Sequence, residues 1–281
     1  MDTETSEPST STSRCEVSDE RRELLHLIPR RSELENLVLE SAGYAWLPVG
    51  ALTAFLSAAL KFAQKVFDER PFEGSPDSRT FRGADLLAGA RYEDAPAFFE
   101  LALSDEILQI AADYMGEIPV LMKPRLWLTK PQLPGTEFGG TQLFHRGRPD
   151  APHIRRQAKF LFTMNEVDDE SGPFTFLPAD VSERILPGYR LGERVSDAET
   201  YRHVCSTEAM RLIGPAGTGL MVDTMRCFHF GRRASSKDRL MLMIQFMRHA
   251  DAPEEDRVGR STAFLDKFGN DAVRKLVMPA W

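Results

Sequence analysis

Two of the six histidines stand in sequence settings that suit metal chemistry. His145 follows a glycine-rich turn in GGTQLFHRG, at the edge of an expected strand, and His229 ends another expected strand in VDTMRCFHFGRR. Their separation of 84 residues excludes a metal pair on one helix turn. Two imidazole ligands on different strands of one sandwich fit this spacing, and imidazole is a common metal ligand.

A third residue, Arg239, lies ten residues beyond His229, where the apolar segment RLMLMIQFM begins. A charged side chain that leads into so apolar a strand should be partly buried and needs a partner. A guanidinium can hold a carboxylate through two parallel hydrogen bonds. The segment therefore favours an anion site at Arg239, where this strand begins.

The elements that must position these residues divide the chain into a helical part and a strand-rich part. Helices are expected after Ser18, from Ser32 to a stop at Gly43, over about 52–67, and after Ser104, with one more near the C-terminus and a long loop at 68–93. Short apolar or alternating segments predict strands at 119–131, 158–167, 173–178, 218–224 and 239–247.

This order of elements predicts an α+β domain, a β-sandwich with helices packed on one face. Residues 1–17 are polar and are expected to form a disordered arm. Residues 18–281 are expected to form a single domain, helical to about 117 and with its strand core at about 118–250.

The ordered segments QLFH, KFLFTMNEVDDESGPFTFLP, GTGLMVDTMRCFHFGRR and RLMLMIQF, with YAWLPVGALT before them, resemble the phytanoyl-CoA dioxygenase-like branch of the Fe(II)/2-oxoglutarate oxygenases. The resemblance covers roughly residues 40–250. It implies a double-stranded β-helix of the jelly-roll or cupin type. It also implies Fe(II) on His145 and His229, the C5 carboxylate of 2-oxoglutarate on Arg239, and O2 as cosubstrate. Arg233 is an alternative anchor whose spacing matches the family less well.

Gly147 departs from the family pattern. The family has H-x-D at the first metal strand, whereas this chain has His145-Arg146-Gly147. In an extended strand, residues i and i+2 project to the same face, so position 147 is where the carboxylate ligand is expected. Glycine supplies no ligand.

Three explanations stay open. A chloride ion could fill the position and conserve the charge, as in the radical halogenases with an H-x-G motif that this arrangement resembles; such an enzyme would chlorinate an unactivated C–H bond. Asp150, or more weakly Glu137, could supply the ligand in a hydroxylase. Gly147 could instead mark an engineered or inactive ligand-deletion variant. A non-catalytic jelly-roll binding protein is the rival from another functional class.

Other residues near the histidines carry weaker signals. The arginines around them, including Arg146, Arg156 and Arg226, form either a solvated rim or an attraction for an anionic substrate. Asp223 could accept a hydrogen bond from a metal-bound imidazole or serve a turn. Cys227 could approach the metal but fits a buried core thiol better. Lys159 stands where the family often has lysine, and no chemistry is assigned to it.

The composition narrows the class of protein. The net charge of −7 argues against a general nucleic-acid binder. The three cysteines form neither a CxxC pair nor an even disulfide set, no segment approaches the length of a membrane span, and the N-terminus lacks a secretory signal. We expect a cytoplasmic enzyme with a small-molecule substrate, one that could be anionic; the sequence does not indicate an oligomeric state.

Overall fold

The computed structural model describes residues 19–69, 83–132, 135, 137–147, 156–185, 189–190, 192–231, 233 and 236–280. The expected arm at 1–17 and the candidate ligand Asp150 lie outside these residues. The strands are β1 Tyr44–Trp46, β2 Gly83–Asp85, β3 Val120–Thr129, β4 Ala158–Thr163, β5 Thr175–Phe176, β6 Met210–Arg211, β7 Gly219–Val222, β8 His229–Phe230 and β9 Arg239–Met247.

The helices of more than one turn are α2 Thr53–Glu69, α3 Pro96–Ala102, α4 Asp105–Met115, α7 Thr262–Phe268 and α8 Ala272–Val277, and two single turns are α5 Ala179–Ser182 and α6 Asp197–Thr200. Short 3-10 turns, such as Ser32–Leu34 and Gly140–Gln142, connect them. None of the helices in the described ranges is long and apolar enough to cross a membrane.

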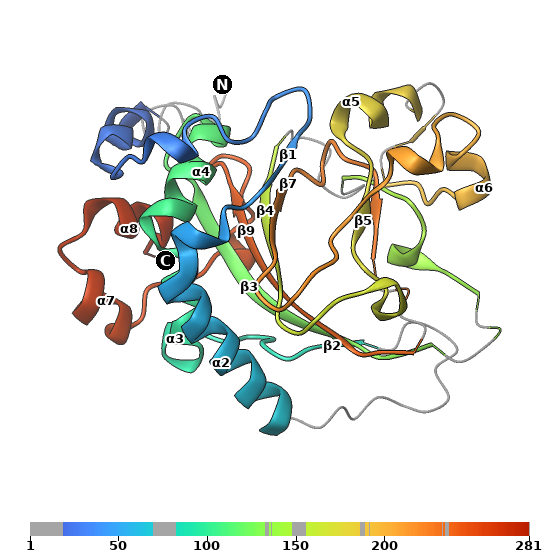
Figure 1. Cartoon of the computed structure of the whole chain (residues 1–281). Coiled ribbons are helices and arrows are strands. Elements are labelled where there is room, and N and C mark those ends of the chain that lie inside the picture. The colour runs from blue at the N-terminus through green and yellow to red at the C-terminus, as the bar shows by residue number, and fades with distance from the viewer. Residues whose placement is uncertain are drawn as a thin grey trace, which may run out of the picture.

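Two antiparallel sheets face each other (Figure 1). The larger has the order β1-β7-β4-β9-β3-β2, and the smaller has the order β6-β5-β8. The expected α+β class with antiparallel strands is therefore confirmed. Two edge strands of the larger sheet, β1 and β2, precede residue 118, where the strand core was expected to begin, and β2 lies within the segment 68–93 that was expected to be a long loop.

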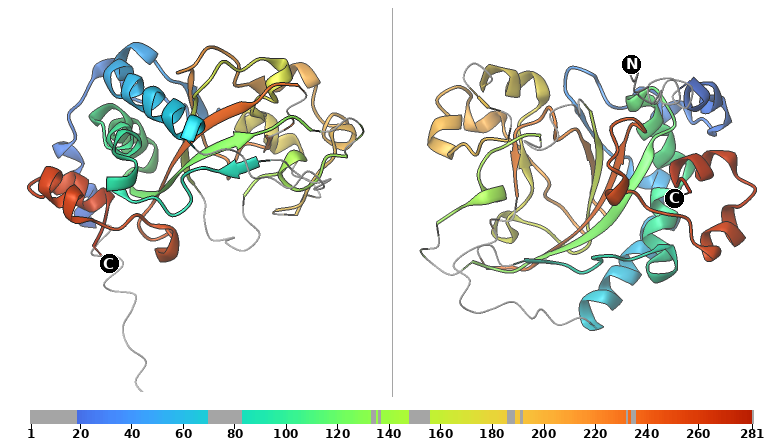
Figure 2. Two further views of the ribbon diagram at one scale, coloured as in Figure 1. Left: turned by 90° about the horizontal axis from the view of Figure 1, so that it is seen from below. Right: turned by 180° about the vertical axis from the view of Figure 1, so that it is seen from behind.

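The larger sheet is buried on both faces, because successive side chains in its strands point to opposite sides. On the outer face, Phe160, Leu242 and Phe246 pack against α2, α3 and α4, with α7 and α8 beside them (Figure 2). On the inner face, Leu161 and Met241 pack against Phe174 and Phe176 next to and within the smaller sheet. The turns α5 and α6 flank the far side of the smaller sheet.

Several expected elements are confirmed and two are wrong. Helix α2, strand β9 and the cap of α4 are as expected, with the Ser104 hydroxyl accepting a hydrogen bond from the Ile107 N–H. The helix expected from Ser32 to Gly43 is only a 3-10 turn at Ser32–Leu34, because Asn36 adopts a left-handed conformation with φ 49°. The single C-terminal helix is two helices, the second begun by the Asp271 side chain, which caps the Arg274 N–H.

Candidate metal centre and cavity

The structure brings His145 and His229 together. Their backbones form an isolated antiparallel bridge, in which the N–H of each donates to the carbonyl of the other, at 3.0 Å and 2.9 Å. Their ring centroids are 4.3 Å apart and the ring planes meet at 48°. Strand β8 carries His229, and its pairing with β5 places that residue opposite Phe176.

Hydrogen bonds to backbone carbonyls set the tautomer of both imidazole rings. Nδ1 of His145 lies 2.8 Å from the Leu143 carbonyl, and Nδ1 of His229 lies 3.0 Å from the Cys227 carbonyl. A carbonyl oxygen only accepts, so each Nδ1 carries the proton and each Nε2 carries the lone pair that binds a metal. Burial lowers the pKa of His229 well below its ordinary value, and the charges of His145 and Lys159 lower it further. The ring is therefore neutral at physiological pH.

Gly147 lies beyond the extended part of its segment. Its φ is +64°, in the left-handed region, and its N–H donates to the Thr224 carbonyl at 3.0 Å. The expectation that residue 147 follows strand alternation from His145 is therefore wrong, because the chain turns at this residue. Glycine adopts the turn without strain, and aspartate and asparagine are the side-chain-bearing residues that tolerate it best.

No third protein ligand is apparent in the described residues. Within them, no group of three His, Cys, Asp or Glu side chains is placed to hold a metal ion. Glu137, the weaker of the two substitutes considered, is exposed. Whether Asp150 reaches the histidines is a question that falls outside the described residues.

Both histidines line a cavity of about 280 Å³ between the two sheets. Its floor is the inner face of the larger sheet and its roof includes β8 and the segment before β5. The other lining residues are Arg125, Trp127, Thr141, Lys159, Leu161, Phe174, Thr224, Gly231, Arg239, Met241, Met243 and Gln245. A cavity that combines apolar side chains with convergent polar groups is typical of a small-molecule site.

Arg239 lies in this cavity at the start of β9 and is only 1% exposed. Its Nη1 donates to the Gly172 carbonyl, and its Nη2 lies 3.4 Å from the Thr129 hydroxyl. Gly231, two residues after His229, lies directly beside it: a Cβ added to Gly231 would stand 3.7 Å from Nη2. The guanidinium thus shares the cavity with both imidazoles, as the proposed carboxylate anchor must.

Arg233, the alternative anchor, is engaged elsewhere. Its guanidinium forms a paired salt bridge with Asp197 at 2.8 Å and 2.9 Å, and its Nε donates to the Gln142 carbonyl at 2.6 Å. It also lies over the Phe230 ring, 3.3 Å from the centroid. It does not line the cavity that holds the histidines. The geometry favours Arg239 over Arg233 as the anchor.

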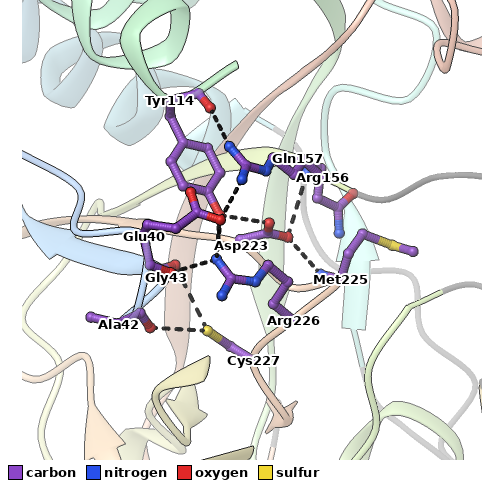
Figure 3. Close-up of polar contacts among 10 residues, drawn as sticks. All are labelled: Glu40, Ala42, Gly43, Tyr114, Arg156, Gln157, Asp223, Met225, Arg226 and Cys227. Carbon is purple, nitrogen blue, oxygen red and sulfur yellow. Dashed lines mark hydrogen bonds and ion pairs between the residues drawn. The ribbon is translucent and has the colours of Figure 1, made fainter. Parts of the chain in front are cut away.

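Three of the arginines that flank the histidines in sequence, Arg146, Arg156 and Arg226, do not line this cavity. Arg156 and Arg226 bind Glu40 and Tyr114 (Figure 3). Arg146 lies beside the rings of Tyr189 and Phe228. Their contacts stabilise the fold around the site.

Asp223 and Cys227 support the fold behind the site (Figure 3). Asp223 accepts a hydrogen bond from the Tyr114 hydroxyl at 2.8 Å and from the Met225 N–H at 2.9 Å. Burial raises the pKa of Asp223 to about 6. Backbone carbonyls, and not Asp223, orient the imidazoles. The Cys227 thiol contacts the carbonyls of Ala42 and Gly43, and burial raises its pKa, so it is an unreactive core thiol.

Sequence reasoning missed Arg125, Lys159 and Gln245 as cavity residues. A signal was present in RLMLMIQFM, where Arg239 and Gln245 occupy the same alternating face of an otherwise apolar strand. Lys159 likewise interrupts the apolar segment AKFLF at a position that faces the inner side of the sheet. Such polar interruptions within a strand buried on both faces mark a cavity.

Solved structures with the same architecture are known. EctD from S. alaskensis in its apo form is 15% identical, with a TM-score of 0.55 over 90% of this chain and 88% of that chain. A complex of the epimerase SnoN with Fe3+, alpha ketoglutarate and nogalamycin RO is 19% identical, with a TM-score of 0.52 over 86% of this chain and 92% of that chain. SnoN is described as a non-heme alpha ketoglutarate dependent epimerase from nogalamycin biosynthesis.

Sequence comparison adds nothing to these structural matches. No protein-family model matches the chain, and no curated protein sequence is significantly similar to it. At these levels of identity the structural likeness concerns the fold. The chain therefore shares the overall fold of the alpha ketoglutarate dependent epimerase SnoN and of EctD.

Proposed function

We propose that this chain is a non-haem Fe(II)- and 2-oxoglutarate-dependent oxidoreductase whose facing antiparallel sheets form a double-stranded β-helix. The observation that carries the proposal is one cavity that contains two imidazoles and a buried guanidinium. The donor set fits the metal, because both rings hold their Nδ1 proton on a backbone carbonyl and keep the Nε2 lone pair for coordination. The fold shared with SnoN agrees with this function.

Each group then has a defined role. His145 and His229 hold the iron, and the antiparallel bridge between their backbones fixes the separation of the rings. Arg239 binds the C5 carboxylate of 2-oxoglutarate, and its bonds to Gly172 and Thr129 orient the guanidinium. When bound, the iron supplies the activation of O2 that oxidises 2-oxoglutarate to succinate and CO2.

Within this class, we propose halogenation of an unactivated C–H bond. The residue at position 147 brings no carboxylate, so chloride would supply the negative charge that such a ligand normally contributes. Gly147 also contributes no side-chain atoms at this position. A hydroxylase in which Asp150 completes the site is the principal alternative, and a chain without metal activity is the other.

Anaerobic titration of the full chain with Fe(II), 2-oxoglutarate and chloride tests the proposal. We expect an absorption band from charge transfer between iron and 2-oxoglutarate, and a shift of that band when chloride is added. A band that ignores chloride favours the hydroxylase, and the lack of any iron binding overturns both enzyme functions. His229→Ala should abolish the band, whereas His203→Ala, which changes an exposed histidine outside the cavity, should preserve it.

A further inference from the structure

The floor of the cavity changes in chemistry from one end to the other. Side chains of β9 that face the cavity are, in order, Arg239, Met241, Met243 and Gln245. The strands on either side of β9 place further residues beside these, in rows that cross the sheet. On β3, Trp127 is opposite Met241 and Arg125 is opposite Met243. On β4, Leu161 is opposite Met243 and Lys159 is opposite Gln245. A cationic end at Arg239 is thus followed by an apolar band and then by a second polar end at Lys159 and Gln245, with Arg125 on β3 one row before it.

The cavity is strongly cationic although the chain carries a net charge of −7. Its described lining includes Arg125, Lys159 and Arg239 and no aspartate or glutamate. Cationic side chains that line a cavity attract an anionic ligand. A substrate with an anionic group therefore fits this lining better than a neutral one.

The histidines lie between the two ends of the floor. Gly231, which follows His229 by two residues, is beside Arg239. On the other side, Thr224, five residues before His229, accepts a hydrogen bond from the Gln157 amide, and the Gln157 side-chain oxygen accepts one from Gln245. The span from Arg239 to Gln245 is roughly 20 Å for six residues of extended strand, which is long enough for the cosubstrate and a second small molecule side by side.

The second polar end is held in place by the surrounding structure. The amide of Gln245 donates to the Gln157 side chain at 3.0 Å, and the Gln157 amide donates in turn to the Thr224 hydroxyl. Arg125 is anchored by an ion pair with Asp85 at 3.6 Å, and its side chain is 40% exposed, which places it toward solvent. These contacts preorganise the group of residues and leave Arg125 at the entrance.

We propose that Arg125, Lys159 and Gln245 form a subsite for the anionic group of the substrate, a phosphate monoester or a carboxylate. The carbon skeleton next to that group would pack on Trp127, Met241 and Met243, close to the histidines. The proposal rests on the proposed function in one respect, because 2-oxoglutarate must occupy Arg239. The substrate class is therefore a small organic acid or phosphate ester, oxidised near its charged end.

Binding of simple probes to the metal-free full chain tests the subsite without relying on iron. Titration calorimetry would compare n-butyl phosphate, butyrate and butan-1-ol. We expect at least one anion to bind measurably and the alcohol not to bind. Lys159→Met and Arg125→Gln should each weaken anion binding by about tenfold, since a charge-assisted hydrogen bond contributes on that scale. The exposed-helix control Lys61→Met should stay within about twofold of the unmodified chain.

The anions also distinguish the two substrate types. Tighter binding of n-butyl phosphate, increasing as pH rises through about 6 where its second proton is lost, supports a phosphate ester. Equal or tighter binding of butyrate supports a carboxylate. Equal affinity for butan-1-ol, or anion binding lost in Arg239→Gln but kept in both Lys159→Met and Arg125→Gln, overturns the subsite. Failure of the iron titration alone would overturn the proposed function and leave this measurement standing.

Discussion

The guanidinium of Arg239 lies against the backbone of Gly231, and a Cβ at residue 231 would stand 3.7 Å from Nη2. Gly231 is itself two residues from His229 on the same short segment. The absence of a side chain at residue 231 leaves open the space between the His229 ring and the Arg239 guanidinium. Under the proposed function, a cosubstrate that spans from the metal to Arg239 would pass through this space.

Gly231→Val should narrow that space and weaken 2-oxoglutarate binding by about tenfold or more, because branched side-chain atoms would crowd the guanidinium. Fe(II) affinity should change much less, since the imidazoles keep their backbone bonds. Separate titrations of Fe(II) and of 2-oxoglutarate measure the two effects. Gly50→Val is the matched control, because a Cβ at Gly50 meets no atom within 4 Å. Equal 2-oxoglutarate affinity in both variants would contradict the placement of the cosubstrate.

Arg239 and Arg233 offer a second matched comparison. Arg239→Gln should reduce 2-oxoglutarate affinity by roughly ten- to a hundredfold, because a charged, two-point contact with the carboxylate is lost. Arg233→Gln should leave that affinity unchanged and instead lower stability, since the bonds to Asp197 and to the Gln142 carbonyl are lost. Equilibrium binding and urea unfolding of both variants separate the roles. Loss of 2-oxoglutarate binding only in Arg233→Gln would reverse the assignment.

The fold was predictable where a local pattern decides the structure. Leu56, Ala59, Ala63 and Val66 repeat at helical spacing in α2 and are buried, so the sequence alone indicated this helix. The helix predicted over residues 33–42 does not form, because the local conformation of the chain overrides the helix propensity of this segment. Asn36 turns left-handed there, and the Leu37 and Val38 side chains that follow are only partly buried, so no helical face forms.

The site was predictable only in part, because its residues are brought together by pairing between distant segments. The residue types and contexts of His145, His229 and Arg239 suggested metal and anion chemistry. The position of Lys159 opposite Gln245 depends on the register of β4 against β9, which no local pattern reveals. The turn at Gly147 depends on a backbone bond to Thr224 across 77 residues, and strand alternation alone gave the wrong conformation there.

The buried carboxyl of Asp223 should make stability depend on pH. Its pKa in the folded state is about 6, above the ordinary value near 3.9, so the folded state holds the proton more tightly than the unfolded state. The contribution of this group to the free energy of unfolding should therefore decrease by on the order of 2 to 3 kcal/mol as the pH rises from about 4 to about 6. Asp223→Asn should lack this component.

Urea unfolding of the unmodified chain and of Asp223→Asn at several pH values from 4 to 7 measures this pH-dependent part of the free energy of unfolding. The difference in stability, Asp223→Asn minus the unmodified chain, should rise as the pH increases across this window and level off above about 6. Tyr114→Phe provides an independent check, because it removes the hydroxyl that donates to Asp223 at 2.8 Å and should extend the fall in stability to higher pH. A flat difference would show that Asp223 titrates normally in the folded state.

Under the proposed halogenation, Gly147 leaves a ligand position to chloride, and two substitutions test this role. Gly147→Ala adds a Cβ without a carboxylate and should destabilise the turn by about 1 kcal/mol, since φ is +64°. Gly147→Asp brings a carboxylate at comparable strain, because aspartate tolerates left-handed backbone.

If chloride is a ligand of the iron in the unmodified chain, Gly147→Asp should bind Fe(II) and 2-oxoglutarate but lose the chloride-dependent shift of the absorption band. Gly147→Ala should keep part of that shift. With an accepted substrate, the product of Gly147→Asp should change from chlorinated to hydroxylated. A Gly147→Asp variant that responds to chloride as the unmodified chain does would refute the halide site. A variant that loses all turnover, with no change of product from chlorinated to hydroxylated, would favour a ligand such as Asp150.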